Sequence, residues 1–425
     1  MTDVVIIGAG LAGLACARRL ATEGVPFALY DAADAPGGRI RTDREDGFLL
    51  DRGFQVLLTA YPEARRVFDY DALDLRAFAP GALVRTRHGF ARVSDPFREP
   101  SAALLSAAAP VGTLADKLRV LRLRQRVRAG RPEEIWFRPE TSTLEALRHR
   151  YGFSERMIEQ FFRPFLGGVL LDRELGTSSR AFEFYFRMFS EGAAALPAGG
   201  MQALPEQLAA ALPPGTLHLN ARAAAIQNGE VRFEDREAVR ARAVVVATDG
   251  PEAAYLLPGL GPPASRSTLC LYWAAEAPPL EDPLLLLDGE GRGPVNNAQV
   301  LTNVAPTYAP AGQALVSATI VGNPAQSDAE AERSARAHLR SWFGPQTDAW
   351  RFLRAYRILH ALPAQLSLEP PERALRLGEG RYVAGDHRRN GSINGALVAG
   401  RHAAEAVLAD LGIVRPGRPN GTHAP

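Results

Sequence analysis

The chain of 425 residues is too long for one ordinary hydrophobic core, so two interleaved domains are expected. It is 46% hydrophobic, 8% aromatic and 23% charged, which is typical of a globular protein, and no apolar run approaches the ~20 residues that cross a bilayer. A net charge of +2 excludes a global field that would attract nucleic acid, so no nucleic-acid partner is expected.

Cysteine and lysine usage narrow the chemistry further. Cys16 and Cys270 have no CxxC spacing, so neither a metal site nor a disulfide framework is expected. A reducing cytoplasm is the default compartment for such a chain, and no signal peptide is expected, because a strand should begin by Val4. Lys117 is the only lysine, so few positions could supply a catalytic amine.

The start of the chain predicts a strand, a turn and a helix, followed by a second strand. Val4–Ile7 is entirely apolar, as expected of a strand buried on both faces. A glycine-rich turn follows at 8–13, a helix should then run to about Thr22, and 26–30 should form the next strand. Beyond this βαβ unit, residues 61–76 are expected to be helical.

The stretch from about 83 to 190 is expected to be mainly helical and rich in aromatic side chains. Its first helix covers 102–128, with a break near Pro110, and six arginines lie between Arg119 and Arg131. Apolar residues recur at helical spacing in two later segments, 144–151 and 155–162.

The remaining chain returns to alternating strands and helices. A small-residue helix is expected over 197–212, a small β-layer from strands at 217–219 and 231–233, and a buried parallel strand at 243–247. Further strands are predicted at 267–274, 284–287, 299–304, 314–321 and 381–384, helices at 327–343 and 393–411, and a frayed tail at 415–425.

The turn at 8–13 has the spacing of a dinucleotide-binding loop. Gly8 would make the tight turn, Gly10 would let the backbone approach a pyrophosphate, and Gly13 would let the helix pack on the sheet. The helix N-terminus offers free N–H groups and a partial positive charge to phosphates. Asp31, at the end of the second strand, could accept hydrogen bonds from a ribose diol.

A second glycine loop distinguishes between NAD and FAD, the two dinucleotides that bind to this motif. It covers 34–42, just past the second strand, and contains Gly37, Gly38 and Arg39. Its backbone N–H groups and the arginine suit the second phosphate and the flavin end of FAD, whereas a simple NAD dehydrogenase has no use for such a loop here. No second strand–GxGxxG–helix unit occurs, so a separate NAD(P)H domain is not expected, and FAD is the predicted cofactor.

Several stretches of the chain together resemble the flavin amine oxidase superfamily, which includes amine oxidases, protoporphyrinogen oxidases and phytoene or carotenoid desaturases. They are GAGLAG at 8–13 with Asp31, GGRIRT at 37–42, FLLDRGFQV at 48–56, PAGGM at 197–201 with Leu204, VVVAT at 244–248, VAGD at 383–386 and GSINGALVAG at 391–400. The resemblance implies an α/β fold in which a Rossmann-type FAD-binding domain is interleaved with an α+β substrate-binding domain.

The resemblance also implies which residues meet the cofactor. Asp386 could accept hydrogen bonds from the ribityl chain, and the helix that begins near Asn394 would direct N–H groups at the N1–C2=O edge of the flavin, where they stabilise the anionic reduced form. The expected cofactor-binding residues are Gly8, Gly10, Leu11, Ala12, Gly13, Asp31, Ala32, Gly37, Gly38, Arg39, Gly53, Phe54, Gln55, Ala224, Thr248, Gly385, Asp386, Ser392, Ile393, Asn394 and Ala396.

Two features of the sequence argue against an ordinary amine oxidase. That branch usually places a lysine near flavin N5, but Lys117 lies in the arginine-rich helical segment, and an arginine could not easily act as a base instead. FFRPFLGGV at 161–169 resembles a segment of protoporphyrinogen oxidases and carotenoid desaturases. RILHALPAQ at 357–365 resembles the stretch before the last FAD segment of protoporphyrinogen oxidases, although positions 364–365 and 386–389 depart from the pattern and leave the branch open.

A hydrophobic small molecule is the expected substrate, because aromatic and aliphatic side chains are dense in the helical insert. The expected pocket residues are Gln55, Phe161, Phe165, His360 and His387, although each aromatic ring could equally belong to the core and each histidine could be structural. No catalytic residue is assigned, because the proton lost in a desaturation could pass to solvent.

The implied activity is that of an FAD-dependent oxidoreductase which takes hydride from C–C or C–N bonds and passes the electrons to O2 or a quinone. Three alternatives stay open: an enzyme that uses reduced FAD to isomerise or saturate a polyene, an amine oxidase without the usual lysine, and a lipid-binding escort protein. The expected FAD-binding domain covers 1–82, 193–265 and 366–425, and the expected substrate-binding domain covers 83–192 and 266–365.

The expected location is the cytoplasm, with peripheral membrane contact as a second option. The helical residues 102–128 combine apolar faces with arginines, so they could lie on a membrane surface or form a solvated face. The sequence does not determine the oligomeric state.

Overall fold

The fold is organised around a twisted sheet that carries both ends of the chain. The computed structural model describes residues 3–95, 97–99, 108–370 and 373–413. The strand order is β10-β2-β1-β14-β21-β20, and all neighbours are parallel except β20 and β21. The strands are β1 (Val4–Ile7), β2 (Phe27–Tyr30), β10 (Leu217–His218), β14 (Ala243–Val246), β20 (Arg376–Gly378) and β21 (Arg381–Val383).

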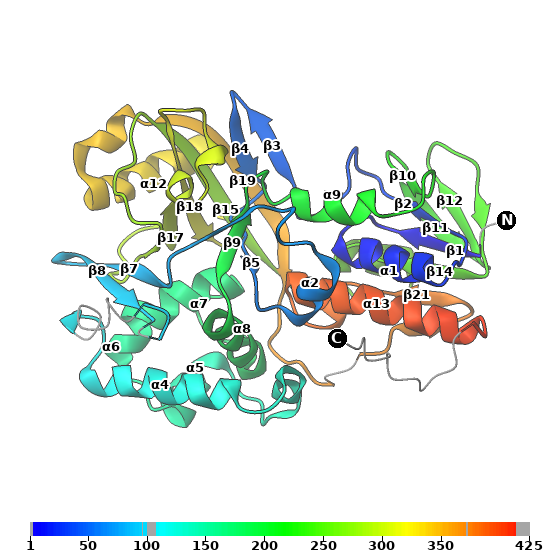
Figure 1. Ribbon diagram of the computed structural model, residues 1–425, viewed down its shortest axis with the longest axis horizontal. Coiled ribbons are helices and arrows are strands. Elements are labelled where there is room, and N and C mark those ends of the chain that lie inside the picture. Colours follow the sequence, from blue (N-terminus) through cyan, green and yellow to red (C-terminus); the bar gives the residue numbers. More distant parts are fainter. Residues whose placement is uncertain (1–2, 96, 100–107, 371–372, 414–425) are drawn as a thin grey trace.

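Helices cover one face of this sheet and a small β-layer covers the other. Val4 and Ile6 pack with α1 (Leu11–Thr22) and α13 (Ile393–Asp410), whereas Val5 and Ile7 pack toward the layer of β11 (Ala223–Gln227), β12 (Glu230–Phe233) and β13 (Val239–Arg240). This alternation explains why β1 has to be apolar on both faces. The assembly forms the right-hand part of Figure 1.

A second, mixed sheet of seven strands stands beside the first one. Its order is β19-β15-β18-β17-β16-β7-β8. The strands are β7 (Gly81–Thr86), β8 (Gly89–Ser94), β15 (Ser265–Ala275), β16 (Leu285–Leu287), β17 (Asn297–Val300), β18 (Ala314–Val321) and β19 (Arg351–Pro363). One face packs on α12 (Asp328–Phe343) through Leu271, Trp273 and Val316.

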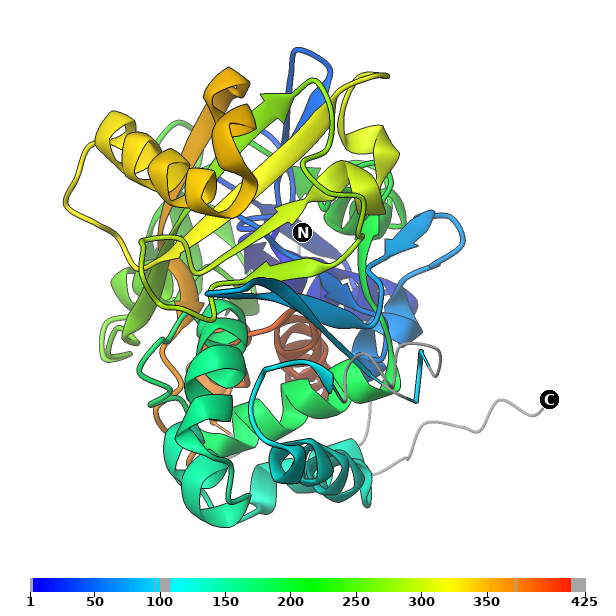
Figure 2. The same ribbon diagram turned by 90° about the vertical axis from the view of Figure 1, so that its left-hand side faces the viewer.

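The other face of the seven-stranded sheet looks toward a bundle of helices. Figure 2 shows the sheet above these helices. They are α4 (Leu114–Arg128), α5 (Thr143–Glu145), α6 (Glu155–Met157), α7 (Arg163–Leu170) and α8 (Ser179–Glu191), with a 3-10 turn at η2 (Pro132–Phe137) and π-turns at η3 (Ala146–Arg150) and η4 (Ile158–Phe162). The mixture of parallel and antiparallel sheets confirms the predicted α/β class with an α+β partner.

Shorter elements complete the fold. They are the hairpin of β3 (Thr42–Glu45) and β4 (Phe48–Asp51), the ribbon of β5 (Leu57–Leu58), β9 (Ala194–Pro197) and β6 (Leu75–Ala77), the helices α2 (Pro62–Val67), α9 (Ala203–Ala210), α10 (Gly250–Leu256) and α11 (Leu301–Val304), and the 3-10 turns η5 (Pro306–Tyr308), η6 (Gly344–Ala349) and η7 (Asp386–Arg388).

The carboxylate of Asp51 ties three of these elements together. It is 2% exposed and accepts hydrogen bonds from the Thr42 hydroxyl at 2.6 Å, the Met201 N–H at 2.9 Å and the Tyr308 hydroxyl at 2.9 Å. Burial raises the pKa of Asp51 to about 6, and these hydrogen bonds only partly offset that effect.

Most predicted elements are confirmed, but four predictions are wrong. The segment 61–76 is helical only in α2, because Phe68 leaves the helix with extended backbone. β10 pairs in parallel with β2 and so belongs to the large sheet, not to the small β-layer. The predicted strand at 299–304 ends at Val300, where α11 begins, and the predicted helix at 197–212 starts only at Ala203.

The predicted helix at 102–128 is confirmed in its second part. α4 begins after Thr113, whose side chain accepts a hydrogen bond from the Asp116 N–H while the Asp116 carboxylate accepts from the Thr113 N–H. Residues 100–107 and the predicted tail at 415–425 lie outside the described residues. The limits of the two predicted domains stay a prediction, and β7 crosses the one placed at residue 82.

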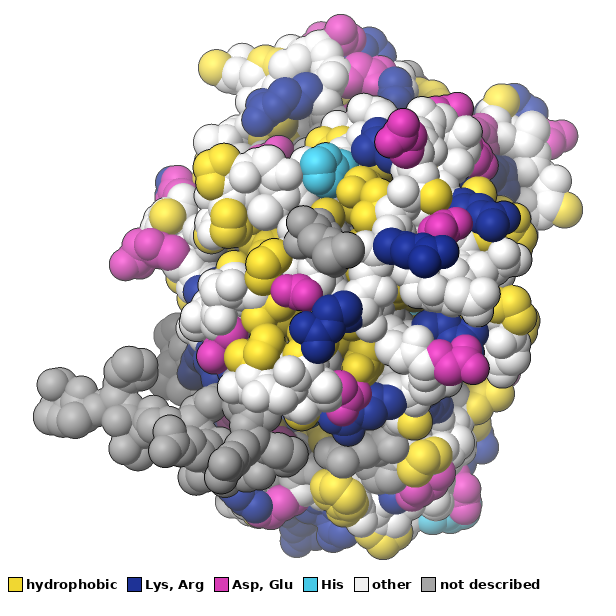
Figure 3. All heavy atoms as spheres, turned by 90° about the vertical axis from the view of Figure 1, so that its right-hand side faces the viewer, with side chains coloured by type: hydrophobic (Ala, Val, Ile, Leu, Met, Phe, Trp, Pro, Cys, Tyr) yellow, Lys and Arg dark blue, Asp and Glu magenta, His cyan; other side chains and the backbone are white. Residues whose placement is uncertain are grey.

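Positive and negative side chains are mixed on the surface around the six-stranded sheet. On the face at the right-hand side of Figure 1, basic and acidic side chains are interspersed (Figure 3), as the small net charge leads one to expect. Among the described residues, no helix is both long and apolar enough to cross a membrane.

Candidate active site

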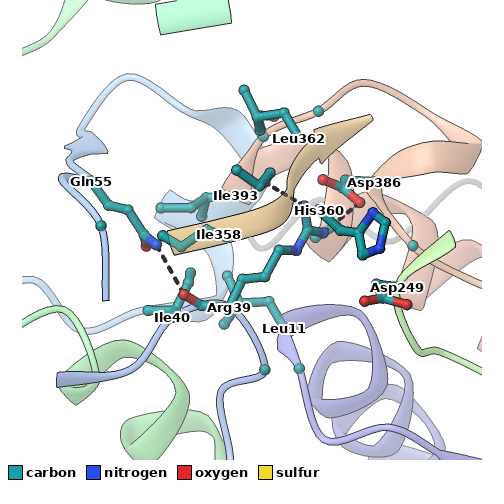
Figure 4. A pocket seen from close by; sticks show the side chains of 18 of the residues that line it. Leu11, Arg39, Ile40, Gln55, Asp249, Ile358, His360, Leu362, Asp386 and Ile393 are labelled. Atoms are coloured by element: carbon teal, nitrogen blue, oxygen red, sulfur yellow. Dashed lines mark hydrogen bonds and ion pairs between the residues drawn. The ribbon is translucent and has the colours of Figure 1, made fainter. Parts of the chain in front are cut away.

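A single cavity of about 910 Å³ runs from the ends of β1, β2 and β14 to the seven-stranded sheet. Its wall combines residues from the first and last segments of the chain with residues from the middle, as in Figure 4, where the Arg39 side chain extends to Asp386. Parallel strands present their carboxyl ends at one edge, which is where α/β folds bind ligands.

The first glycine loop leaves open space where a phosphate would have to approach. Gly8 has φ +104°, and a Cβ there would lie 2.8 Å from the Ala247 carbonyl oxygen. A Cβ on Gly13 would lie 1.8 Å from the Gly8 carbonyl oxygen, so this residue sets the helix–strand approach. A Cβ on Gly10 would meet only the Gly37 oxygen, 4.0 Å away. No side chain caps the N-terminus of α1, so its first N–H groups are available to an anion.

Asp31 joins the two loops that flank this space. One carboxylate oxygen accepts from the Ala9 N–H at 2.5 Å and the other accepts from the Ala33 N–H at 2.7 Å. Because a carboxylate has about four lone-pair sites, it can still accept hydrogen bonds from a ribose diol. Asp31 and Ala32 both lie in the cavity wall.

The second glycine loop packs directly on the first. Gly37 donates its N–H to the Ala9 carbonyl at 2.9 Å, and a Cβ on Gly38 would lie 3.5 Å from the Gly10 Cα. The two loops therefore pack together as one cradle. This cradle fits the pyrophosphate of a dinucleotide.

Arg39 extends from this cradle across the cavity. Its guanidinium donates to the Asp386 carboxylate at 2.7 Å and to the Ala361 carbonyl of β19 at 2.8 Å. Burial lowers the pKa of Arg39, but the charge of Asp386 and the hydrogen bond to it outweigh burial and leave the pKa above its ordinary value. The arginine is thus a fixed cation in the wall, next to the cradle.

The segment before α13 is held in place by buried polar contacts. The side chain of Gln365 accepts from the Gly391 N–H at 2.9 Å, and the Tyr185 hydroxyl donates to the Gly391 carbonyl at 3.0 Å. The Ser392 hydroxyl caps α13 by accepting from the Gly395 N–H at 2.9 Å. These contacts aim the helix N-terminus at the cavity, where Ile393 and Ala396 lie in the wall.

Most residues predicted to bind the cofactor come together in this wall. The members that line it are Gly8, Gly10, Leu11, Ala12, Asp31, Ala32, Gly37, Gly38, Arg39, Gly53, Phe54, Gln55, Thr248, Gly385, Asp386, Ser392, Ile393 and Ala396. Their contacts with the cofactor stay a prediction.

Three of the predicted cofactor residues lie behind the wall. Gly13 supports the turn from inside α1. The Asn394 side chain accepts from the Glu63 N–H at 2.9 Å, so it faces α2. Ala224 lies on β11 beside Ala223, and it is Ala223 that lines the cavity, because neighbouring residues of a strand point to opposite faces.

The far end of the cavity is apolar, but only part of the predicted pocket lies there. Phe165, Gln55 and His360 line the wall. Phe161 instead stacks on Phe165 from behind, with ring centroids 5.5 Å apart. His387 also lies outside the wall and packs over Gly385, where a Cβ would come within 2.5 Å of its ring.

Buried His387 is unsuited to act as a base in this cavity. Its two ring nitrogens have no hydrogen-bond partner among the described residues, and burial lowers its pKa to about 4. The neutral ring fills space beneath Gly385, which agrees with the structural reading of this histidine.

Some wall residues carried no usable signal in the sequence. Val169, Leu171, Phe189, Leu285, Asn297 and Thr319 come from α7, α8 and the seven-stranded sheet, far apart along the chain. The long strand β19 adds Ile358 and Leu362, since alternate residues of a strand share one face. The strand at 351–363 mixes arginines with apolar residues, so it could have been recognised only from its pairing with β15.

Comparisons with known proteins agree with the predicted family. Residues 11–408 match the family described as flavin containing amine oxidoreductase. Mitochondrial protoporphyrinogen oxidase from Nicotiana tabacum is 32% identical over 98 residues, which cover 23% of this chain and 19% of that protein. A lycopene-forming phytoene desaturase from Pseudescherichia vulneris is 44% identical over 57 residues, 13% of this chain and 12% of that protein.

The fold is also shared with solved structures. An oxidoreductase from Methanosarcina mazei has a TM-score of 0.75 at 18% identity, with 95% of this chain and 100% of that chain covered. The matches to the two curated relatives span less than a fifth of their length, so they do not assign a substrate. The family match extends over nearly the whole chain and confirms the predicted flavin cofactor and enzyme class. The chain belongs to the flavin containing amine oxidoreductase family and is an FAD-dependent oxidoreductase.

Proposed function

We propose that the protein takes a hydride from a C–H bond of a hydrophobic substrate, so that a C–C or C–N single bond becomes a double bond, and passes the two electrons to O2 or a quinone. The observation that carries this proposal is the continuity of one cavity, with the glycine cradle at one end and an apolar chamber at the other. Phe54, Phe165, Val169, Phe189 and Leu285 contribute to the chamber. Such a wall favours an apolar substrate.

The chain's own residues would hold the cofactor along this cavity. Asp31 would accept from the ribose, the α1 N-terminus would face the pyrophosphate, and Arg39 would neutralise phosphate charge. The N-terminus of α13 would face the flavin and favour negative charge there. When bound, the flavin supplies acceptance of a hydride.

The position of Lys117 supports a reaction other than lysine-assisted amine oxidation. Lys117 lies on the helix α4, and its ammonium group donates to the Ala109 carbonyl at 2.8 Å. The residue does not line the cavity. The substrate would still lose one proton for each hydride. We assign that proton to solvent, to which His360, the one histidine of the described wall, is exposed.

Anaerobic mixing tests this function. Holoenzyme is mixed without oxygen with polyenes, porphyrinogens and amines, and the visible flavin band is followed. We expect polyenes or porphyrinogens to bleach the band and air or a soluble quinone to restore it. Bleaching by primary amines alone would contradict the proposed substrate class, and a colourless protein that cannot take up FAD would contradict the cofactor assignment.

A further inference from the structure

The apolar chamber has a polar floor. On the cavity side of the seven-stranded sheet, Thr268, Asn297 and Thr319 lie in the wall, from three neighbouring strands. Each is at most 7% exposed. Buried polar groups are costly unless they are hydrogen-bonded, so a floor of this kind needs an explanation.

The floor is held in one orientation by a neighbouring carboxamide. Asn296 is fully buried and donates one N–H to the Pro164 carbonyl of α7 at 2.8 Å and the other to the Asn297 side-chain oxygen at 2.9 Å. Because a carbonyl can only accept, the Pro164 contact fixes the amide of Asn296, which in turn fixes that of Asn297. The side-chain oxygen of Asn297 therefore accepts from Asn296, and its NH2 group faces the rest of the floor.

Thr268 donates its hydroxyl to the Ile320 carbonyl at 3.1 Å, whereas the donors of Asn297 and Thr319 are only weakly used within the protein. The Asn297 NH2 group has two long contacts, 3.4 Å to Gln299 and 3.4 Å to the Thr319 hydroxyl oxygen. In the second contact Thr319 accepts, and its own O–H has no acceptor among the described residues. The floor thus offers donors to whatever occupies the chamber.

The chamber contains no charge to match a charged ligand. The ionisable side chains in the described wall are Asp31, Arg39, Arg222, Asp249, Glu252, His360 and Asp386, apart from its tyrosines. None of them comes from α7, α8 or β15 to β18, and the only one on β19, the other strand at the chamber, is the histidine His360. Burying a carboxylate or an ammonium group there without a partner would be costly.

We propose that the substrate of this enzyme carries a neutral oxygen acceptor, a carbonyl, hydroxyl or ether oxygen, which binds Thr319 and Asn297 at the floor. This inference rests on the proposed function, in that the substrate occupies the chamber next to the flavin. It narrows the substrate class from an apolar molecule to one with a neutral oxygen at one end. A pure hydrocarbon would leave the donors unpaired, and a site built in this way discriminates against such an analogue.

A cycle of ligand and protein changes tests the proposal. The probes are two pairs of an alcohol and its hydrocarbon counterpart: retinol with axerophtene, and dodecanol with dodecane. The equilibrium binding of each probe to the holoenzyme is measured as its partition between enzyme and solution. Thr319→Val removes the hydroxyl at constant shape. We expect it to weaken binding of the alcohols about three- to tenfold relative to the hydrocarbons.

Two variants serve as controls in the same cycle. Thr319→Ser keeps the hydroxyl and should restore the alcohol-to-hydrocarbon ratio. Ser317→Ala removes a buried hydroxyl from the same strand. This hydroxyl accepts a hydrogen bond from Gln299, and Ser317 does not line the cavity, so the variant should leave the ratio unchanged.

The outcomes separate this proposal from the proposed function. A ratio that Thr319→Val leaves unchanged in both probe pairs overturns the neutral-oxygen proposal, and so does an equal effect of Ser317→Ala. Partition does not depend on flavin reduction, so the bleaching experiment can succeed where this one fails, and the reverse.

Discussion

At the scale of single residues, Gly10 gives the sharpest test of cofactor placement. Its backbone, with φ −72° and ψ 178°, is acceptable to any residue, and a Cβ would point into open cavity. Gly10→Val should therefore fold normally but occupy the space of the phosphates. We expect the purified variant to contain less than about a tenth of the wild-type FAD, a loss of more than about 1.4 kcal/mol, as measured by absorption of released flavin.

The matched control is Gly261→Val, because a Cβ at this exposed glycine meets no other atom. This variant should retain full FAD. Stoichiometric flavin in Gly10→Val would show that the loop is not the phosphate site.

Residues with one fixed backbone task were the most predictable. Gly8 and Gly37 have positive φ in turns whose spacing is readable in the sequence. Tyr185 and Gln365 could not be found in this way, because they reach the closing motif at Gly391 from 206 and 26 positions away. Side-chain packing also decided the misses: His387 turned beneath Gly385, and Phe161 turned behind Phe165.

At the scale of elements, Asp51 links the hairpin β3–β4 to the turn before α9 and to η5 at the cost of a buried carboxyl group. Its pKa is raised to about 6, above the ~3.9 of an unfolded aspartate. Between these values the folded chain holds a proton that the unfolded chain has lost. The free energy of unfolding therefore falls as pH rises through this window.

Asp51→Asn removes this pH dependence and keeps the shape of the side chain. Its oxygen can still accept from Thr42 and Met201, and its NH2 group can donate to the Tyr308 oxygen. Relative to wild type, we expect the variant to gain stability from about pH 4 to about pH 7, by at most about 3 kcal/mol. Urea unfolding at both pH values measures the difference.

Tyr308→Phe is the comparison for that series. It keeps the carboxyl group and removes one of the hydrogen bonds that lower its pKa, so the pH dependence must persist. A stability difference between Asp51→Asn and wild type that does not change with pH would contradict the assignment.

Elements with a strong local pattern were predicted almost to the residue. β1, β14 and α12 have either continuous apolar runs or a capping box at Ser327 and Glu330. The wrong elements depend on distant partners. Val300 ends its strand because Leu301–Val304 turns against β18, and β10 joins the large sheet because β2 has a free edge. No local pattern carries that information.

At the scale of the whole molecule, the helix α4 presents one surface that could bind a lipid membrane. Leu114 and Leu118 lie one helical turn apart and are 70% and 55% exposed. Arg119 and Arg122 lie on the same helix. We propose that this surface binds anionic membranes peripherally, through apolar contact together with arginine–headgroup attraction.

Vesicle sedimentation checks this proposal. Wild type should sediment with phosphatidylglycerol vesicles, less so at high salt, and Arg119/Arg122→Glu should lower the bound fraction at least about threefold. Arg232/Arg240→Glu makes the same change in net charge on the exposed β-layer and should have little effect. Equal loss in both double variants would point to net charge alone, and no loss in either would rule out α4.

The contact between β19 and the loop at Gly53 constrains how this enzyme could be redesigned. A Cβ on Gly53 would lie 2.5 Å from the Cδ1 atom of Ile358 on β19. Three residues further along the same strand, the Ala361 carbonyl accepts a hydrogen bond from Arg39. One strand therefore serves the chamber on its face and the cofactor cradle through its backbone. Substitutions in β19 that are meant to change the substrate should therefore often weaken FAD binding as well. Substitutions in β16 and β17 reach the chamber without touching the cofactor cradle.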